Sequence, residues 1–116
     1  MIYYDIIIME VFVWENKEYT ILIGKDKSNN WKLIDDAKET DVWFHVSNSP
    51  SAHIILQTEE TSIPRQVITR CACICKSKSS KKSDKKCEII YTTIGNVKKT
   101  NIVGQVVTSN TKRISI

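Results

Sequence analysis

Short runs of β-branched and aromatic residues recur along nearly the whole 116-residue chain. Such runs, separated by polar or glycine-containing segments, are typical of β-strands. We place strands at residues 2–14, 19–23, 42–46, 53–56, 88–93, 102–108 and 113–116. No run approaches the ~18 apolar residues of a membrane-spanning helix. The chain is therefore expected to build a sheet, and no membrane is expected as a partner.

Two pairs of these runs are close enough in sequence to form hairpins. The polar connection at residues 15–18 predicts a four-residue loop between the first two runs. The next two runs lie on either side of a turn at residues 48–51. An antiparallel pair centred on Ser49 places His45 opposite His53, with both rings on one side of the sheet. At least one of two such imidazoles should be neutral and hydrogen-bonded at pH 7.

A first helix is predicted between the second and third runs. Asn29 or Asn30 can cap its first N–H groups, and Trp31 and Ile34 follow at helical spacing. We expect this helix to end at residues 40–41.

A second helix is predicted by a stronger pattern. Ser62 is a suitable N-cap, and Pro64 falls in the first turn, where its missing N–H has no cost. One apolar stripe follows at helical spacing, formed by Val67, Ile68, Cys71, Ala72, Ile74 and Cys75. Together these elements predict one α+β domain over residues 1–116, a largely antiparallel β-sheet with two helices packed against it.

The charged residues are divided unevenly between the two halves of the chain. Residues 1–64 hold five lysines and eleven acidic residues, a net −6, whereas residues 65–116 hold twelve basic and two acidic residues, a net +10. The two halves give the overall charge of +4. Residues 76–86 are too polar to pack and predict a mobile basic loop. Such segregation favours binding to a polyanion, although it is also typical of solvated lysines.

The cysteines and histidines do not form a recognisable catalytic or metal-binding motif. Cys71, Cys73 and Cys75 lack the two-residue gap of structural zinc pairs, and buried small apolar residues are the better interpretation. The two histidines lie in apolar strands, with no nucleophile in a recognisable elbow beside them. We expect no enzymatic activity, no cofactor and no metal. The thiols favour a reducing compartment, and we expect a cytoplasmic protein.

Two further features are compatible with nucleic-acid binding. Lys25 and Lys27 precede the first helix, whose N-terminal N–H groups can hold a phosphate. Tyr91, Trp31 and Trp43 are candidate stacking platforms for unpaired bases, with a core role the simpler interpretation for Trp43. Each feature is weak by itself.

Several strings taken together resemble the NFACT RNA-binding domain in order and spacing. They are Gly-Lys-Asp-Lys-Ser-Asn-Asn at residues 24–30, Asp-Val-Trp-Phe-His-Val at 41–46, Ser-Ala-His at 51–53, Ile-Pro at 63–64, Cys-Ala at 71–72, Tyr-Thr at 91–92, Asn-Val-Lys-Lys at 96–99 and Val-Gly-Gln at 103–105. The resemblance covers about residues 19–116 and is closest to the short standalone eukaryotic form. The family often has Arg where Lys25 stands, and Gly-Ser where Ser51 and Ala52 stand.

The resemblance implies a non-catalytic RNA-binding module with an α+β fold. Larger members act on stalled large ribosomal subunits and engage tRNA during ribosome-associated quality control. The resemblance and the lysine-rich loop together give the candidate nucleic-acid-binding residues Lys25, Lys27, Asn30, His45, Ser51, His53, Lys81, Lys82, Lys85, Lys86, Lys98 and Lys99. We expect Lys98 and Lys99 to lie in a loop and to face the same side as Lys25.

The sequence therefore leaves one leading hypothesis and two alternatives. The leading hypothesis is an RNA-binding module whose ligand is tRNA or rRNA, with the ribosome as a candidate partner. The first alternative is a protein-interaction module in a ribosome-associated complex, in which the basic loop serves solubility. The second is a general DNA or RNA polyanion binder. Binding to tRNA, single-stranded RNA and duplex DNA at two salt concentrations separates these hypotheses.

Overall fold

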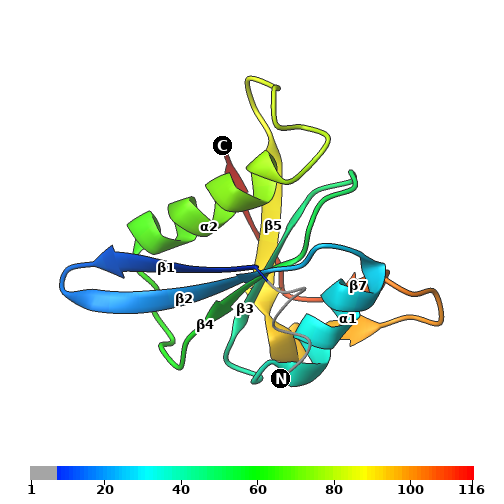
Figure 1. Ribbon diagram of the computed structural model, residues 1–116, viewed down its shortest axis with the longest axis horizontal. Helices are drawn as coiled ribbons and strands as arrows, with labels where there is room; N and C mark the ends of the chain where they lie inside the picture. Colours follow the sequence, from blue (N-terminus) through cyan, green and yellow to red (C-terminus); the bar gives the residue numbers. More distant parts are fainter. Residues whose placement is uncertain (1–7) are drawn as a thin grey trace.

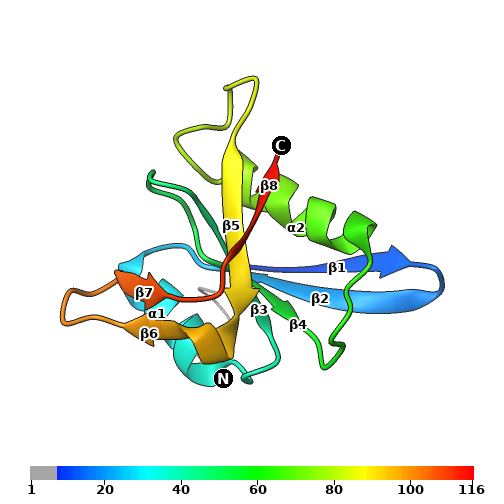
Figure 2. The ribbon, with the colours of Figure 1, turned by 180° about the vertical axis from the view of Figure 1, so that it is seen from behind.

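A six-stranded antiparallel sheet forms the centre of the computed structural model, which describes residues 8–116 (Figure 1). Its strands, in spatial order, are β1 (Ile8–Trp14), β2 (Lys17–Ile23), β4 (Ile54–Gln57), β3 (Val42–Val46), β5 (Glu88–Thr93) and β8 (Lys112–Ser115). A separate hairpin of β6 (Val97–Lys99) and β7 (Val106–Thr108) follows the 3₁₀ turn Ile94–Asn96 (Figure 2). Two helices complete the fold, α1 (Lys27–Asp36) and α2 (Arg65–Ser77). The α+β prediction is confirmed, and the extended segment predicted at residues 2–7 lies outside the described residues.

The two helices cover opposite faces of the sheet. Alternate residues of β3 point to opposite sides, so Phe44 packs in the α2 cluster and Trp43 packs in the α1 cluster. All six residues predicted for the apolar stripe of α2 are buried, which confirms that stripe. From α1, Leu33 and Ile34 pack against Trp43 and Ile55. The sheet is therefore the middle layer of three.

The first hairpin has a shorter turn than the four residues predicted. Trp14 pairs with Lys17, which leaves only Glu15 and Asn16 in the turn. Both have positive φ, 50° and 65°, as a two-residue hairpin turn of the I′ type requires. The prediction was wrong because the polar side chains of Lys17 and Glu18 belong to the exposed start of β2.

Both predicted helix N-caps were wrong. Asp26 caps α1, and its Oδ1 accepts a hydrogen bond from the Asn29 N–H at 2.8 Å. Pro64 is itself the N-cap of α2, and its carbonyl accepts bonds from the Val67 and Ile68 N–H groups at 3.0 and 3.2 Å. Several residues before each helix are suitable N-caps by residue type. The backbone geometry decides which of them serves as the N-cap. The α1 helix also ends at Asp36, earlier than predicted.

The chain between β5 and β8 differs most from the prediction. Residues 102–105 form a turn, so only residues 106–108 of the predicted strand are extended. Lys98 and Lys99 lie in β6, where a loop was predicted. Ile102 and Val103 are exposed at the tip of the hairpin, and their apolar character led to the wrong assignment.

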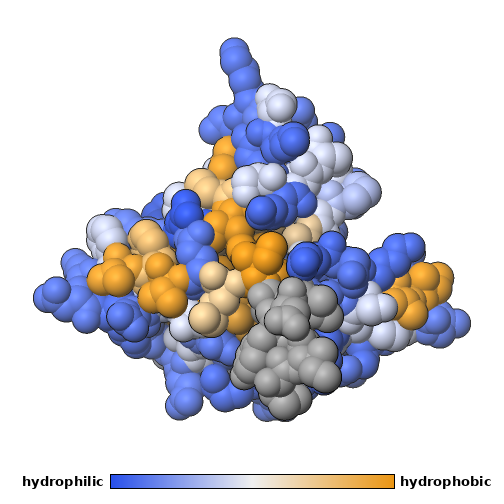
Figure 3. Space-filling view, in the orientation of Figure 1, coloured by the Kyte–Doolittle hydropathy of each residue, from blue (hydrophilic) through white to orange (hydrophobic). Residues whose placement is uncertain are grey.

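Figure 3 shows apolar side chains in several places on one face, among them the β1–β2 hairpin and the tip of the β6–β7 hairpin. Met9, Val11 and Val13 project from β1, and Ile102 and Val103 lie at the β6–β7 tip. None of the helices within residues 8–116 is long and apolar enough to span a membrane.

Candidate nucleic-acid interface

A cleft of about 560 Å³ lies where β2 ends, α1 begins and α2 ends. Three lysines from two segments far apart in sequence line it. Lys25 precedes α1, Lys27 is the first residue of α1, and Lys78 lies at the end of α2. Asn30 and Ser51 also line this cleft. Four of the predicted site residues therefore share one concave surface.

The loop from Gly24 to Lys27 is held by hydrogen bonds to buried groups. Gly24 N–H donates to the His53 carbonyl at 3.0 Å, and Lys25 N–H donates to Asn29 Oδ1 at 2.8 Å. A Cβ at position 24 would collide with Asn30 Oδ1, so glycine is required there. Lys25 and Lys27 consequently extend from a fixed backbone, and both are exposed. Their charges, next to the N-terminus of a helix, favour an anionic ligand.

Asn30 links this loop to the neighbouring turn. Its side chain is buried, and its Oδ1 accepts the His53 N–H at 3.2 Å. Ser51 holds the same turn from the other side, because its hydroxyl accepts the Val46 N–H at 3.1 Å and donates to the Ala52 carbonyl at 3.1 Å. Residue 51 also forms a bridge with Ser79. Both predicted site residues therefore position the cleft walls.

The histidine geometry confirms the predicted register. Trp43 pairs with Ile55 and Phe44 with Ile54, an arrangement centred on Ser49 that places His45 opposite His53. The two rings have centroids 5.1 Å apart on one side of the sheet. His53 Nδ1 accepts a hydrogen bond from Trp43 Nε1 at 3.1 Å, and His45 Nδ1 lies 2.6 Å from the Val46 carbonyl.

Burial keeps both imidazoles neutral. Desolvation and, to a smaller extent, the neighbouring His45 together lower the pKa of His53 to about 3. Desolvation also lowers the pKa of His45, partly offset by its hydrogen bond to the Val46 carbonyl. His53 is only 2% exposed. It therefore acts as a positioning residue behind the cleft and supplies no positive charge at pH 7.

Lys98 and Lys99 point to different sides of β6. Lys99 forms an ion pair with Asp35 at 2.6 Å, and its ammonium lies 4.9 Å from the centroid of the Trp31 ring. Side chains alternate along a strand, so Lys98 is on the outer side of the hairpin. Because the two lysines point to different sides, the expectation that both face the side of Lys25 is not met. Lys99 covers Trp31, which leaves that indole less open as a stacking platform.

The basic loop after α2 contributes lysines of two kinds. Lys81 forms an ion pair with Asp84 at 3.7 Å. Lys82, Lys85 and Lys86 are exposed and form no ion pair with any described residue. The loop base is anchored by the Lys76 ammonium, which donates to the Asp84 carbonyl at 2.6 Å and to the Ile116 carbonyl at 3.1 Å.

Sequence reasoning missed Lys78. Lys78 belongs to the same lysine-rich stretch as the four predicted loop residues. The composition therefore indicated the segment but not this residue. Only the end of α2 and the pairing of Ser79 with Ser51 place Lys78 in the cleft. Trp43, in contrast, is 2% exposed and has the core role that the sequence favoured.

The cysteines are the remaining chemistry-bearing side chains among residues 8–116. All four cysteines are free thiols. Cys71 and Cys75 are buried, as predicted, Cys87 is also buried, and Cys73 is half-buried. Desolvation raises the pKa of Cys75 to about 12, so its thiol stays protonated. Within the described residues, no three His, Cys, Asp or Glu side chains are grouped to hold a metal ion.

Comparisons with known proteins agree with the resemblance seen in the sequence. The family described as "NFACT protein RNA binding domain" matches residues 8–114. Coiled-coil domain-containing protein 25 of Mus musculus is 37% identical over 87 residues, which cover 71% of this chain and 42% of that protein. Its Dictyostelium discoideum homolog is 33% identical over 104 residues, covering 84% of this chain and 50% of that protein. Protein JLP2 of Saccharomyces cerevisiae is 35% identical over 103 residues, covering 77% and 50%.

This chain thus spans at most half the length of these three relatives. A solved structure, the C-terminal part of the fibronectin/fibrinogen-binding protein from Streptococcus suis, superposes with a TM-score of 0.82 at 21% identity. The superposition covers 93% of this chain and 44% of that chain. At this identity the likeness shows the fold.

Proposed function

Because this chain belongs to the NFACT RNA-binding domain family, we propose that it is a non-catalytic module that binds tRNA or rRNA through the cleft of Lys25, Lys27 and Lys78. The single observation that carries the proposal is the convergence of these lysines from two distant segments. A role in translation or ribosome-associated quality control in the cytoplasm belongs to the same proposal.

The electrostatics of the cleft support a phosphate ligand. Among residues 8–116, Asp26 is the one carboxylate that lines the cleft, and it accepts the Asn29 N–H as a helix cap. The exposed Lys82, Lys85 and Lys86 extend the positive surface along the neighbouring loop. Phosphate contacts supply most of the affinity of proteins for nucleic acids and make it depend on salt.

The protonation and hydrogen bonding of the polar side chains support a non-catalytic role. His45 and His53 are neutral and hydrogen-bonded to their own chain, so neither is poised as a general acid. The Ser51 hydroxyl donates its hydrogen bond to the Ala52 carbonyl. A nucleophilic serine instead donates this hydrogen bond to a general base. These groups hold the walls of the cleft, and the lysines are left to contact the ligand.

Filter binding of two matched double variants tests the proposal with tRNA, single-stranded RNA and duplex DNA. Lys25→Ser with Lys78→Ser removes two cleft lysines, and Lys17→Ser with Lys32→Ser removes two lysines elsewhere. Each phosphate contact contributes about −0.7 to the log–log salt slope for a single strand. We expect the cleft variant to flatten the slope by roughly 1.4 and the control variant to leave it nearly unchanged.

A third variant tests the loop. Replacing Lys81, Lys82, Lys85 and Lys86 with Ser should flatten the slope by roughly two or more. Equal losses in the two double variants would instead indicate a polyanion binder that responds only to net charge. Absence of RNA binding by the unmodified protein would favour the protein-interaction hypothesis.

A further inference from the structure

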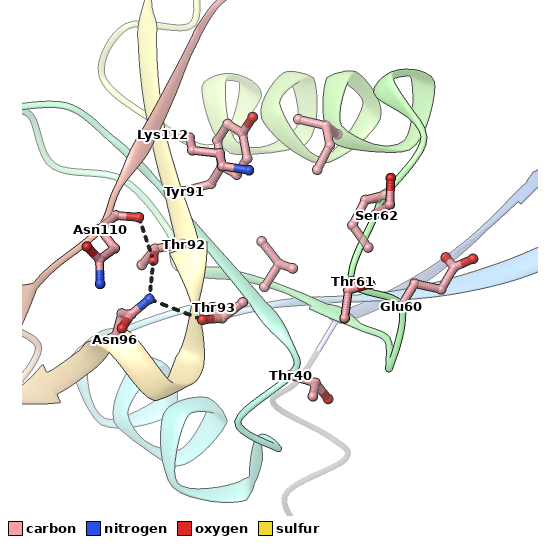
Figure 4. A pocket seen from close by; sticks show the side chains of 13 residues that line it. Thr40, Glu60, Thr61, Ser62, Tyr91, Thr92, Thr93, Asn96, Asn110 and Lys112 are labelled. Atoms are coloured by element: carbon pink, nitrogen blue, oxygen red, sulfur yellow. Dashed lines mark hydrogen bonds between the residues drawn. The ribbon is translucent and has the colours of Figure 1, made fainter.

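A second cleft, of about 440 Å³, lies on the α2 side of the sheet at the opposite end of β3 (Figure 4). Val42, the first residue of β3, lines it, whereas the backbone of Val46, the last residue, contacts Ser51 of the lysine cleft. The second cleft is bordered by β5, by the segment before β8 and by the loop that leads into α2. Its volume is within the range of about 300–1,000 Å³ typical of ligand pockets.

An aromatic ring forms part of the floor. Tyr91 stacks on Phe44, with centroids 5.3 Å apart and planes inclined by 19°. Phe44 is fully buried and covers one side of the Tyr91 ring, while Tyr91 itself lines the cleft. Val42 and Ile68 complete an apolar floor beside it. A flat ligand can therefore lie against a ring that is fixed from behind.

The rim holds neutral donors and acceptors in a fixed arrangement. Asn96 Nδ2 donates to the Thr92 and Thr93 hydroxyl oxygens at 3.1 and 3.2 Å. The Thr92 hydroxyl lies 3.2 Å from the Asn110 carbonyl and so holds that residue, whose φ is +52° (Figure 4). Within residues 8–116, the Asn96 Oδ1 and the Asn110 side-chain amide form no hydrogen bond. Both are available to a ligand.

Among residues 8–116, Lys112 is the one cation and Glu60 the one carboxylate that line the cleft. Lys112 is opposite Tyr91 in the β5–β8 ladder and forms no ion pair with a described residue. The acidic Glu60 on the other wall is neutralised by Lys17 at 3.0 Å. The site thus combines an aromatic floor, an amide rim and one positive charge.

We propose that this second cleft binds an unstacked nucleobase against Tyr91, with the attached phosphate at Lys112. Bases stack on aromatic side chains through their flat faces, and amides hydrogen-bond to their edges. The inference rests on the proposed function, since the RNA held at the lysine cleft supplies the base. A free mononucleotide carries the same chemistry, and the two sources are separated below.

Titration of the intact chain with AMP and with ribose 5-phosphate, followed by NMR, tests the base. We expect AMP to shift the amide signals of Tyr91, Thr92 and Asn96, and ribose 5-phosphate to bind at least tenfold more weakly. Tyr91→Leu should lower AMP affinity about tenfold, because stacking is lost, whereas Tyr91→Phe should keep it within about twofold. Lys112→Gln should weaken both ligands alike.

The lysine-cleft variant Lys25→Ser with Lys78→Ser is the matched control and should bind AMP as the unmodified protein does. Equal binding of AMP and ribose 5-phosphate, or unchanged AMP binding by a folded Tyr91→Leu variant, would overturn the base site. Neither result depends on whether the lysine cleft binds RNA.

The source of the base is tested with a short single-stranded RNA and the same RNA containing one abasic position. Tyr91→Leu should weaken the intact RNA about tenfold and the abasic RNA hardly at all. If the variant weakens AMP but binds the intact RNA normally, the RNA source is overturned and the ligand is a free nucleotide. If no RNA binds the unmodified protein while AMP does, the proposed function fails and the base site stands.

Discussion

The two faces of the central sheet differ in what they bury. The α2 face is lined by aliphatic, aromatic and cysteine side chains, including Ile21, Phe44 and Cys71. Beside the α1 face the buried residues include polar ones, namely Asn29, Asn30 and His53. Each of these three side chains is hydrogen-bonded to a named partner.

Because of this difference, the α2 face mainly stabilises the fold, whereas the α1 face positions the loops of the lysine cleft. Apolar burial is non-directional and depends on area, so the α2 face stabilises the fold without fixing any particular loop. A buried polar group is costly unless its partner is in place, so it fixes the segments it joins. The α1 face therefore holds the loop at residues 24–27 and the turn at residues 47–52 in the shape of the lysine cleft.

The largest effect is expected from truncation on the α2 face. Ile21→Ala removes a fully buried side chain and should lower the free energy of unfolding by about 2–5 kcal/mol. Leu22→Ala, on the opposite face of the same strand and only half-buried, should cost clearly less. Thermal or urea denaturation measures both, and the Ile21→Ala variant should bind RNA normally while folded. Equal costs would remove the contrast between the faces.

Loss of a polar link on the α1 face should affect both stability and binding. Asn30→Ala leaves the His53 N–H without its acceptor and should cost about 1–3 kcal/mol. Because the link joins two walls of the lysine cleft, RNA affinity of the folded protein should also fall. Asn30→Asp keeps an acceptor oxygen and should recover part of the stability. Unchanged RNA affinity in a folded Asn30→Ala variant would contradict a positioning role.

The α1 face should also make stability depend on pH. The folded-state pKa of His53, about 3, is below the ordinary value of 6.5, so protonation favours the unfolded chain. This stability is fully present above pH ~6.5 and is lost as pH falls toward 3. Between pH 7 and 5 we expect a loss on the order of 2 kcal/mol from this residue. Urea denaturation across this range should give a flatter profile for His53→Gln than for the unmodified protein.

The smallest effect is expected from a surface pair on the α2 side. The Arg70 guanidinium donates to both carboxylate oxygens of Glu10, at 2.6 and 2.7 Å, and so joins α2 to β1. Both side chains are partly exposed, so Glu10→Gln should cost only about 0.2–1 kcal/mol. The difference in free energy of unfolding between this variant and the unmodified protein should shrink at high salt. A larger, salt-independent loss would show that polar links also fix the α2 face.

Predictions from the sequence succeeded where a local pattern was sufficient. The stripe of α2 follows from helical spacing, β3 and β5 follow from runs of β-branched and aromatic residues, and the β3–β4 register follows from the turn centred on Ser49. The structure confirms all of them. They failed at the β6–β7 hairpin, where Ile102 and Val103 are apolar yet exposed, and at the helix N-caps, where several neighbouring residues were equally suitable. Local patterns do not rank such candidates, because the choice depends on which hydrogen bonds the rest of the chain completes.

The candidate site divides in the same way. The sequence by itself determined the α+β class, the family resemblance and the lysines at positions 25 and 27, because these depend on residue types and their order. Only the tertiary structure decided that Lys78 joins them, that Lys99 is paired with Asp35, and that His53 is buried and neutral. The physical reason is that ion pairing, burial and the shape of a cleft depend on contacts between segments far apart in sequence.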